Sequence, residues 1–234
     1  CTNGYNVSFC QTHCSWLTMY SIESDVISER MRAAVSLGWS IFSKKAGNNL
    51  VAINKEASMQ LQYAYVLQQL IPLITFSSGD RFNIELETGI NIHGRTREID
   101  LVFSGISQQQ SHTIAIEMKC YRTLSSSGGK RGATDIFMKD VYEDLQLLEQ
   151  YVSVGGMSEG VSLVMNDMER LVNPKSKSTK CWDYDISQGA SFGPIDLTTP
   201  IGGKDVNISL AKSYSIDWSK NGDYWFLEIQ GRSM

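Results

Sequence analysis

The sequence predicts an α/β domain in which a central mixed β-sheet is flanked by α-helices. Two helical patterns near the start of the chain precede three segments with strand periodicity, and a further helix and strand follow. Three neighbouring strands with short connections favour an antiparallel meander. A strand that follows a helix is expected to run parallel to an earlier strand. The expected sheet is therefore mixed.

Two amphipathic helices are expected before the first strand. From Ser24 onward apolar residues recur at spacings of three and four, and Gly38 fits a helix C-cap. A second apolar stripe predicts a helix over residues 55–70, with Pro72 marking its exit.

Alternating apolar and polar residues then predict the three strands of the meander. Their expected ranges are 82–86, 98–103 and 113–119, with a turn at 91–94 and a polar loop at 105–112. A Gly- and Ser-rich loop at 124–132 leads into a helix over 135–152 and a short buried strand over 161–165. Weaker strand patterns follow at 206–210 and 224–229.

These patterns divide the chain into three parts. Residues 19–165 form the expected core, and residues 166–234 form a β-rich extension packed on the same domain. Residues 1–18 have little charge and no clean period, so they are treated as an uncertain N-terminal extension. They lack the basic start and long apolar core of a signal peptide.

The composition of the chain argues against some classes of function. The 234 residues are 42% hydrophobic and 20% charged, which is ordinary for a globular protein. No apolar run reaches the ~20 residues that span a bilayer. A net charge of −4 argues against coating nucleic acid through bulk charge, but it leaves room for a local basic groove.

The five cysteines are an odd number without regular spacing, which favours a reduced, cytoplasmic location over a secreted disulfide framework. Cys1, Cys10, His13 and Cys14 could in principle bind zinc, but their spacing matches no strong zinc motif.

A candidate catalytic constellation lies on the second and third predicted strands. Glu117 and Lys119 point to the same face of the third strand, because side chains alternate along a strand. A hairpin would bring Asp100 of the second strand close to them. The strand that holds Glu117 and Lys119 is otherwise apolar, and isolated charges there would be costly without a function.

Two carboxylates and an ammonium group are the set that phosphodiester hydrolysis needs. Carboxylate oxygens hold a hard cation such as Mg²⁺. The cation polarises phosphoryl oxygens and lowers the pKa of a bound water. A lysine beside it orients that water or balances charge in the transition state. We therefore expect Asp100 and Glu117 to bind metal and Lys119 to position the attacking water.

The segments at 97–100 (REID) and 114–119 (IAIEMK) resemble the paired motifs of the PD-(D/E)XK nuclease superfamily, with Ile99 in place of the usual proline. The resemblance covers residues 24–165. It implies a restriction endonuclease-like core and a DNA endonuclease that uses Mg²⁺, with Mn²⁺ able to substitute. It also implies an acidic metal ligand on an early helix, for which Glu56 is the first candidate and Glu29 the second.

The resemblance further implies a helix after the Glu-x-Lys strand whose polar face supports the site. Lys139, Tyr142 and Gln146 share one helical face and are the residues predicted to stand behind the metal ligands and support them. Basic residues around this region would contact the DNA backbone. The predicted DNA-binding residues are Arg122, Lys130, Arg131, Lys175 and Lys177.

Other interpretations stay open. A Glu-x-Lys pattern also arises by chance on solvent-facing strands, Glu56 fits a solvated first helical turn, and Lys139 fits an ordinary i,i+4 surface pair with Glu143. The alternative function is a catalytically inactive nuclease-fold subunit that binds nucleic acid or another protein. For an active enzyme we expect a role in restriction, defence or DNA repair, and a homodimer would supply the two sites needed to cut both strands.

Overall fold

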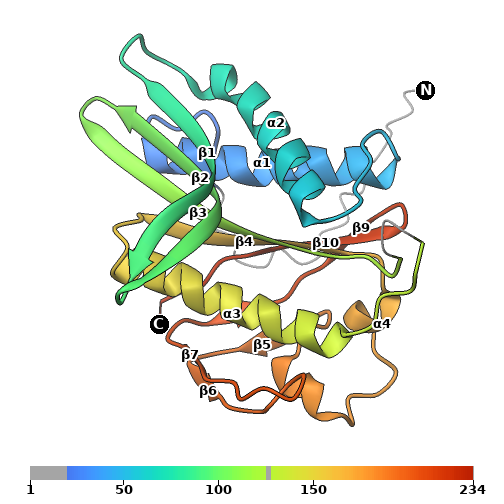
Figure 1. The fold of residues 1–234 in the computed structure, drawn as a ribbon. Helices are drawn as coiled ribbons and strands as arrows, with labels where there is room; N and C mark the ends of the chain where they lie inside the picture. The colour runs from blue at the N-terminus through green and yellow to red at the C-terminus, as the bar shows by residue number, and fades with distance from the viewer. Residues whose placement is uncertain (1–19, 125–127, 234) are drawn as a thin grey trace, which may run out of the picture.

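Two helices cover one face of a mixed β-sheet and a third helix covers the other face (Figure 1). The computed structural model describes residues 20–124 and 128–233. The predicted extension at 1–18 and its candidate zinc ligands lie outside these ranges. The helices are α1 (Ile27–Gly47), α2 (Glu56–Ile74), α3 (Thr134–Ser153) and the short α4 (Glu169–Val172), with a 3₁₀ turn at Lys180–Tyr184. None of the helices in the described part of the chain is long and apolar enough to cross a bilayer.

The central sheet is built from six strands of the described residues in the order β1-β2-β3-β4-β10-β9. Their bounds are β1 (Arg81–Ile92), β2 (Arg95–Ser107), β3 (Gln110–Tyr121), β4 (Glu159–Asn166), β9 (Ser219–Asn221) and β10 (Tyr224–Ile229). The first three form an antiparallel meander, and β4 runs parallel to β3 after the crossover through α3. The predicted mixed sheet, its meander and its parallel strand are confirmed.

The strands of the meander extend further than their apolar alternation predicted. β1 continues to Ile92, which pairs with Arg95 of β2, although most of its side chains are exposed or half-buried. A tight turn joins β2 to β3 where a longer loop was predicted, and both of its central residues, Gln108 and Gln109, have positive φ angles. Backbone pairing therefore sets these lengths, not burial of apolar side chains alone.

The two N-terminal helices also pass the residues at which they were predicted to end. Gly38 lies inside α1 and faces α2, where a Cβ would lie 3.5 Å from Leu70 and 3.5 Å from Tyr63. Pro72 lies within the last turn of α2. Gly38 is thus a residue of the α1–α2 contact and not a helix cap.

This packing predicts that Gly38→Ala will raise the Tm by roughly 1–4 °C. A glycine inside a helix costs about 0.5–1 kcal/mol relative to alanine, and 1 kcal/mol shifts the Tm of a chain of this size by about 2–4 °C. The matched control is Gly47→Ala, whose Cβ would lie 2.5 Å from the Asn221 carbonyl oxygen and should lower the Tm. Thermal unfolding of both variants checks this, and a lower Tm for Gly38→Ala would contradict the described helix contact.

The sheet separates two apolar clusters. Ile116 and Met118 of β3 belong to the cluster beneath α1 and α2, whereas Ala115 belongs to the cluster around α3. Because side chains alternate along a strand, Glu117 and Lys119 share the α3 face with Ala115. The apolar positions of β3 therefore fix the side on which its charged residues lie.

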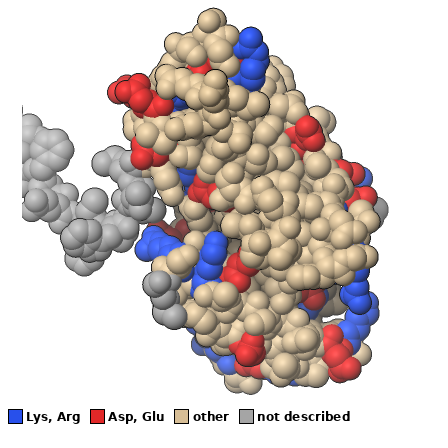
Figure 2. Space-filling view, turned by 90° about the vertical axis from the view of Figure 1, so that its left-hand side faces the viewer, with Lys and Arg blue, Asp and Glu red and all other residues tan. Residues whose placement is uncertain are grey.

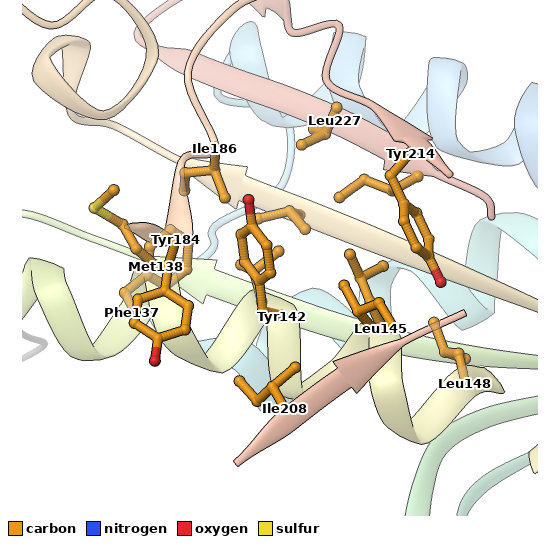
Figure 3. Packing of buried hydrophobic residues seen from close by; sticks show 14 of the residues in the cluster. Phe137, Met138, Tyr142, Leu145, Leu148, Tyr184, Ile186, Ile208, Tyr214 and Leu227 are labelled. Carbon is orange, nitrogen blue, oxygen red and sulfur yellow. The ribbon is translucent and has the colours of Figure 1, made fainter. Parts of the chain in front are cut away.

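Helix α3 is buried on two sides, because the C-terminal third of the chain covers the side that faces away from the sheet. Figure 3 shows Tyr142 and Leu145 of α3 close to Ile186 and Ile208 from that region, whereas Leu227 lies on β10 of the central sheet. The C-terminal third includes two small sheets, formed by β5 (Ser191–Phe192) with β8 (Tyr214–Ser215) and by β6 (Ile195–Leu197) with β7 (Ile208–Leu210). Since β10 also pairs with β4, the C-terminal third completes the central sheet as well as packing on it.

Candidate active site

Asp100 lies where β2 loses its regular pairing. The β2–β3 pairing ends at Leu101, and Glu87 on the neighbouring β1 has a positive φ of 50°, a form of backbone strain that clusters at functional sites. The Asp100 carboxylate bonds instead to both flanking elements. Its Oδ2 accepts the backbone N–H of Met118 at 2.6 Å, and its Oδ1 accepts Nε2 of Gln60 at 2.6 Å. Asp100 is therefore held from β3 and from α2.

The Glu117 carboxyl group is buried on the α3 side of the sheet, with 5% of the residue exposed. Its Oε1 is shielded from solvent and makes no hydrogen bond within the described residues. Burial raises the pKa of Glu117, and the charges of Asp144 and Asp100 raise it further. An ionised Glu117 is therefore short of positive partners.

The Lys119 ammonium group lies between α2 and α3. Its Nζ is 3.3 Å from Oδ2 of Asp144 and 3.8 Å from Oε1 of Glu56. Burial lowers the pKa of Lys119, but the carboxylates of Asp144, Glu56 and Asp100 raise it more strongly, so the pKa lies above its ordinary value. Lys119 therefore keeps its positive charge and lies between the acidic side chains of Glu56 and Asp144.

Glu56 stands in the first turn of α2, close to the predicted site. Its Oε2 accepts the backbone N–H of Cys120 at 3.1 Å. Burial raises the pKa of Glu56, the nearby Lys119 lowers it and the Asp100 charge raises it, with a net upward shift. The second candidate, Glu29, lies elsewhere, where its exposed carboxylate accepts the Ser24 hydroxyl. The structure therefore brings Glu56, but not Glu29, to Asp100 and Lys119.

Asp144 of α3 also reaches this site, although its sequence position was not singled out. Only 6% of Asp144 is exposed, and burial together with the Asp100 and Glu56 charges raises its pKa against the lowering effect of Lys119. One signal in the sequence does mark it. Asp144 lies at helical spacing inside the stripe of Val141 and Leu145, where a charged residue interrupts an otherwise buried face.

Tyr142 and Gln146 do not support the site as predicted. The Tyr142 hydroxyl donates to the Asp185 backbone oxygen at 2.9 Å, and the Gln146 side chain donates to the Ser209 backbone oxygen at 3.5 Å. Both contacts lie in the C-terminal third, because α3 turns the face that carries Asp144 toward the sheet. The prediction that Tyr142 and Gln146 support the catalytic residues is therefore wrong, because both side chains are bound to the C-terminal third.

Lys139, the third residue predicted to support the site, pairs with carboxylates of its own helix. Its Nζ lies 2.6 Å from Oδ1 of Asp140 and 2.7 Å from Oε2 of Glu143. The second of these is the i,i+4 surface pair that the sequence left open. The Lys139 ammonium group is therefore directed at α3 carboxylates and not at Glu117 or Asp100.

Two of the five predicted DNA contacts are engaged in intramolecular pairs. Nε of Arg122 lies 3.0 Å from Oδ2 of Asp167, and its guanidinium group lies 4.9 Å from the centre of the Tyr224 ring. Nζ of Lys177 lies 2.6 Å from Oδ2 of Asp185. These cations stabilise local structure, so a DNA phosphate would have to compete with their present partners.

The other three predicted DNA contacts differ in their exposure. Lys130 and Lys175 are exposed, and Arg131 is half-buried. Figure 2 shows a face of the molecule on which basic and acidic side chains are interspersed among many uncharged residues. The basic groups on that face are scattered, so any attraction of a DNA backbone there would be local.

The donor chemistry of the site fits a hard divalent cation. In the described ranges no three His, Cys, Asp or Glu residues are arranged to hold a metal ion as they stand. However, Asp100 and Glu117 supply carboxylate oxygens, the ligands that Mg²⁺ and Mn²⁺ favour. The buried Oε1 of Glu117 has no hydrogen-bond partner within the described residues. Buried oxygens are rarely left unpaired, and a bound cation would pair this one.

Comparisons of the chain with protein-family models, with curated proteins and with solved structures gave no match. The chemistry of the site is therefore the basis of the proposed function.

Proposed function

We propose that the protein is a metal-dependent endonuclease that hydrolyses DNA phosphodiester bonds. The observation that carries the proposal is the proximity of Asp100, Glu117 and Lys119 between α2 and α3, with one buried Glu117 oxygen lacking a hydrogen-bond partner in the described residues. The order of two helices, a three-stranded meander, a helix and a parallel strand supports the resemblance to a restriction endonuclease-like core. That resemblance supplies DNA as the substrate class.

Asp100 and Glu117 would hold the cation. When bound, Mg²⁺ or Mn²⁺ would supply Lewis-acid polarisation of the phosphoryl oxygens and make a water more acidic. The protein contributes the positions of these groups. Gln60 and the Met118 N–H fix the two oxygens of Asp100, so the carboxylate needs little rearrangement before reaction.

Lys119 would act directly on the reacting groups. From its position between Glu56 and Asp144, its ammonium group can donate a hydrogen bond to the attacking water or to a phosphoryl oxygen as negative charge builds there. In the hydrolysis the water oxygen forms a bond to phosphorus, the ester P–O bond breaks, and the leaving oxygen takes a proton. The exposed Lys130 and Lys175 would contact backbone phosphates.

The test is cleavage of supercoiled plasmid DNA in Mg²⁺ by wild type and by Lys119→Ala. We expect the variant to be slower by roughly 10²–10³-fold, the usual effect of removing one contact to developing charge. Lys44→Ala, which removes an exposed lysine of α1, is the matched control and should cleave like wild type. Equal trace cleavage by wild type and Lys119→Ala would reject the proposal. Salt-dependent DNA binding without cleavage under any divalent metal would favour the inactive nucleic-acid-binding alternative.

A further inference from the structure

The site holds more negative charge than its lysine can balance. The Lys119 ammonium group lies 3.3 Å from Asp144 and 3.8 Å from Glu56, and the Asp100 charge also acts on it. The charges of Asp144 and Asp100 act in turn on the buried Glu117 carboxyl. Glu117 and Asp144 are 5% and 6% exposed. Buried charges without partners are costly, so this arrangement favours a further cation at the same place.

The two carboxylates contributed by helices, those of Glu56 and Asp144, differ in how firmly their present contacts hold them. Oε2 of Glu56 accepts the Cys120 backbone N–H, and 36% of its side chain is exposed. The Asp144 side chain is 9% exposed and contacts the Lys119 ammonium group at 3.3 Å, a contact that a small movement of the flexible lysine would release. Asp144 is thus the better placed of the two to take a cation in exchange for Lys119.

We propose that Asp144 is a third carboxylate ligand of the divalent cation, beside Asp100 and Glu117. The inference rests on the proposed metal-dependent function and extends it to α3, so that the ligands come from β2, β3 and α3. Its independent support is the unpartnered, buried Oε1 of Glu117, which lies on the same side of the sheet as α3 and within the electrostatic reach of Asp144.

Isothermal titration of the metal-free protein with Mn²⁺ tests the proposal without using activity. We expect Asp144→Asn to weaken Mn²⁺ binding by at least about tenfold, because an amide is a poorer ligand than a carboxylate. Glu143→Gln removes a neighbouring carboxylate of α3 whose partner is Lys139, and it should bind Mn²⁺ like wild type. Thermal unfolding without metal checks that each variant is folded. Asp144→Asn binding as tightly as wild type would overturn the assignment.

A second variant keeps the test decisive if the asparagine protein does not fold. Asp144→Cys places a small, softer ligand at the position, and thiolates favour softer metals. The ratio of Cd²⁺ to Mn²⁺ affinity should therefore rise by at least about tenfold over wild type. A purely structural role for Asp144 would leave that ratio unchanged and would overturn the proposal.

Failure of this inference can be told apart from failure of the proposed function. If wild type cleaves DNA and binds Mn²⁺ but Asp144→Asn binds it equally well, only the ligand assignment fails. If Mn²⁺ binding depends on Asp144 but wild type cleaves no DNA, the assignment stands and the endonuclease proposal fails. If wild type binds no Mn²⁺ at all, both are overturned.

Discussion

Glu117→Gln will reduce the proposed DNA cleavage activity by roughly 10²–10³-fold and will at the same time raise the Tm of the metal-free protein. The loss follows from the removal of a proposed metal-binding carboxylate from the transition state. The gain in stability follows from burial, because the wild-type residue is 5% exposed and its ionised form is disfavoured by the Asp144 and Asp100 charges, whereas the amide carries no charge. An increase of about 1–2 kcal/mol in the free energy of unfolding corresponds to a Tm higher by roughly 2–8 °C in a chain of this size.

Plasmid cleavage and thermal unfolding of one protein preparation measure both effects. The control is Glu85→Gln, which changes an exposed carboxylate of β1 and should leave both quantities nearly unchanged. Stability and activity moving in opposite directions at Glu117 would be expected of a site built for a cation. A variant that is less stable and equally active would show that Glu117 is a structural acid, and the endonuclease proposal would lose its main support.

The order of the elements could be predicted because it depends on local patterns. Alternation marked the meander strands, and a helix of about five turns before a buried strand implied the parallel pairing of β4 with β3. The lengths of the strands could not be predicted, since backbone pairing between β1 and β2 continues through exposed positions such as Arg95. Gly38 was misplaced as a cap because its contact with α2 joins residues far apart in the sequence.

The strand part of the site could also be predicted, because alternation alone determines that Glu117 and Lys119 share a face. The helix part could not. A period of 3.6 identifies the apolar side of a helix with one exposed face, but α3 is covered on two sides. The polar face was assigned to Tyr142 and Gln146, which point to the C-terminal third, while Asp144 points to the sheet.

Asp80→Ala will be strongly destabilising, although Asp80 is remote from the proposed chemistry. Its Oδ2 lies 3.3 Å from Nη2 of Arg30, and the two side chains are 1% and 3% exposed. Asp80 also accepts hydrogen bonds from the Phe76 N–H, from Ser77 and from the Ser107 hydroxyl, which tie the α2–β1 connection to β2. Breaking a buried ion pair by removing one partner costs about 3–5 kcal/mol, which corresponds to a Tm lower by roughly 6–20 °C.

The pH dependence of this effect has a definite sign. Burial raises the pKa of Asp80, but the hydrogen bonds from Phe76, Ser77 and Ser107 outweigh it and lower the pKa to about 2. Because the folded pKa lies below the unfolded value of about 3.9, the carboxylate contributes its full stability above that value and loses it as the pH falls toward 2. The Tm difference between wild type and Asp80→Ala should therefore shrink as the pH falls from about 4 to 2, as long as both proteins remain folded.

A double variant separates the cost of the unpaired charge from the cost of the lost hydrogen bonds. Combining Asp80→Ala with Arg30→Met leaves no buried charge, so it should recover part of the Tm lost in Asp80→Ala. The exposed Lys220–Glu169 pair is the reference, and Glu169→Gln should change stability by less than about 1 kcal/mol. If Asp80→Ala were no more damaging than Glu169→Gln, the Arg30–Asp80 pair could not be what joins α1 to the start of β1. If the double variant recovered nothing, the hydrogen bonds of Asp80 would carry the whole effect.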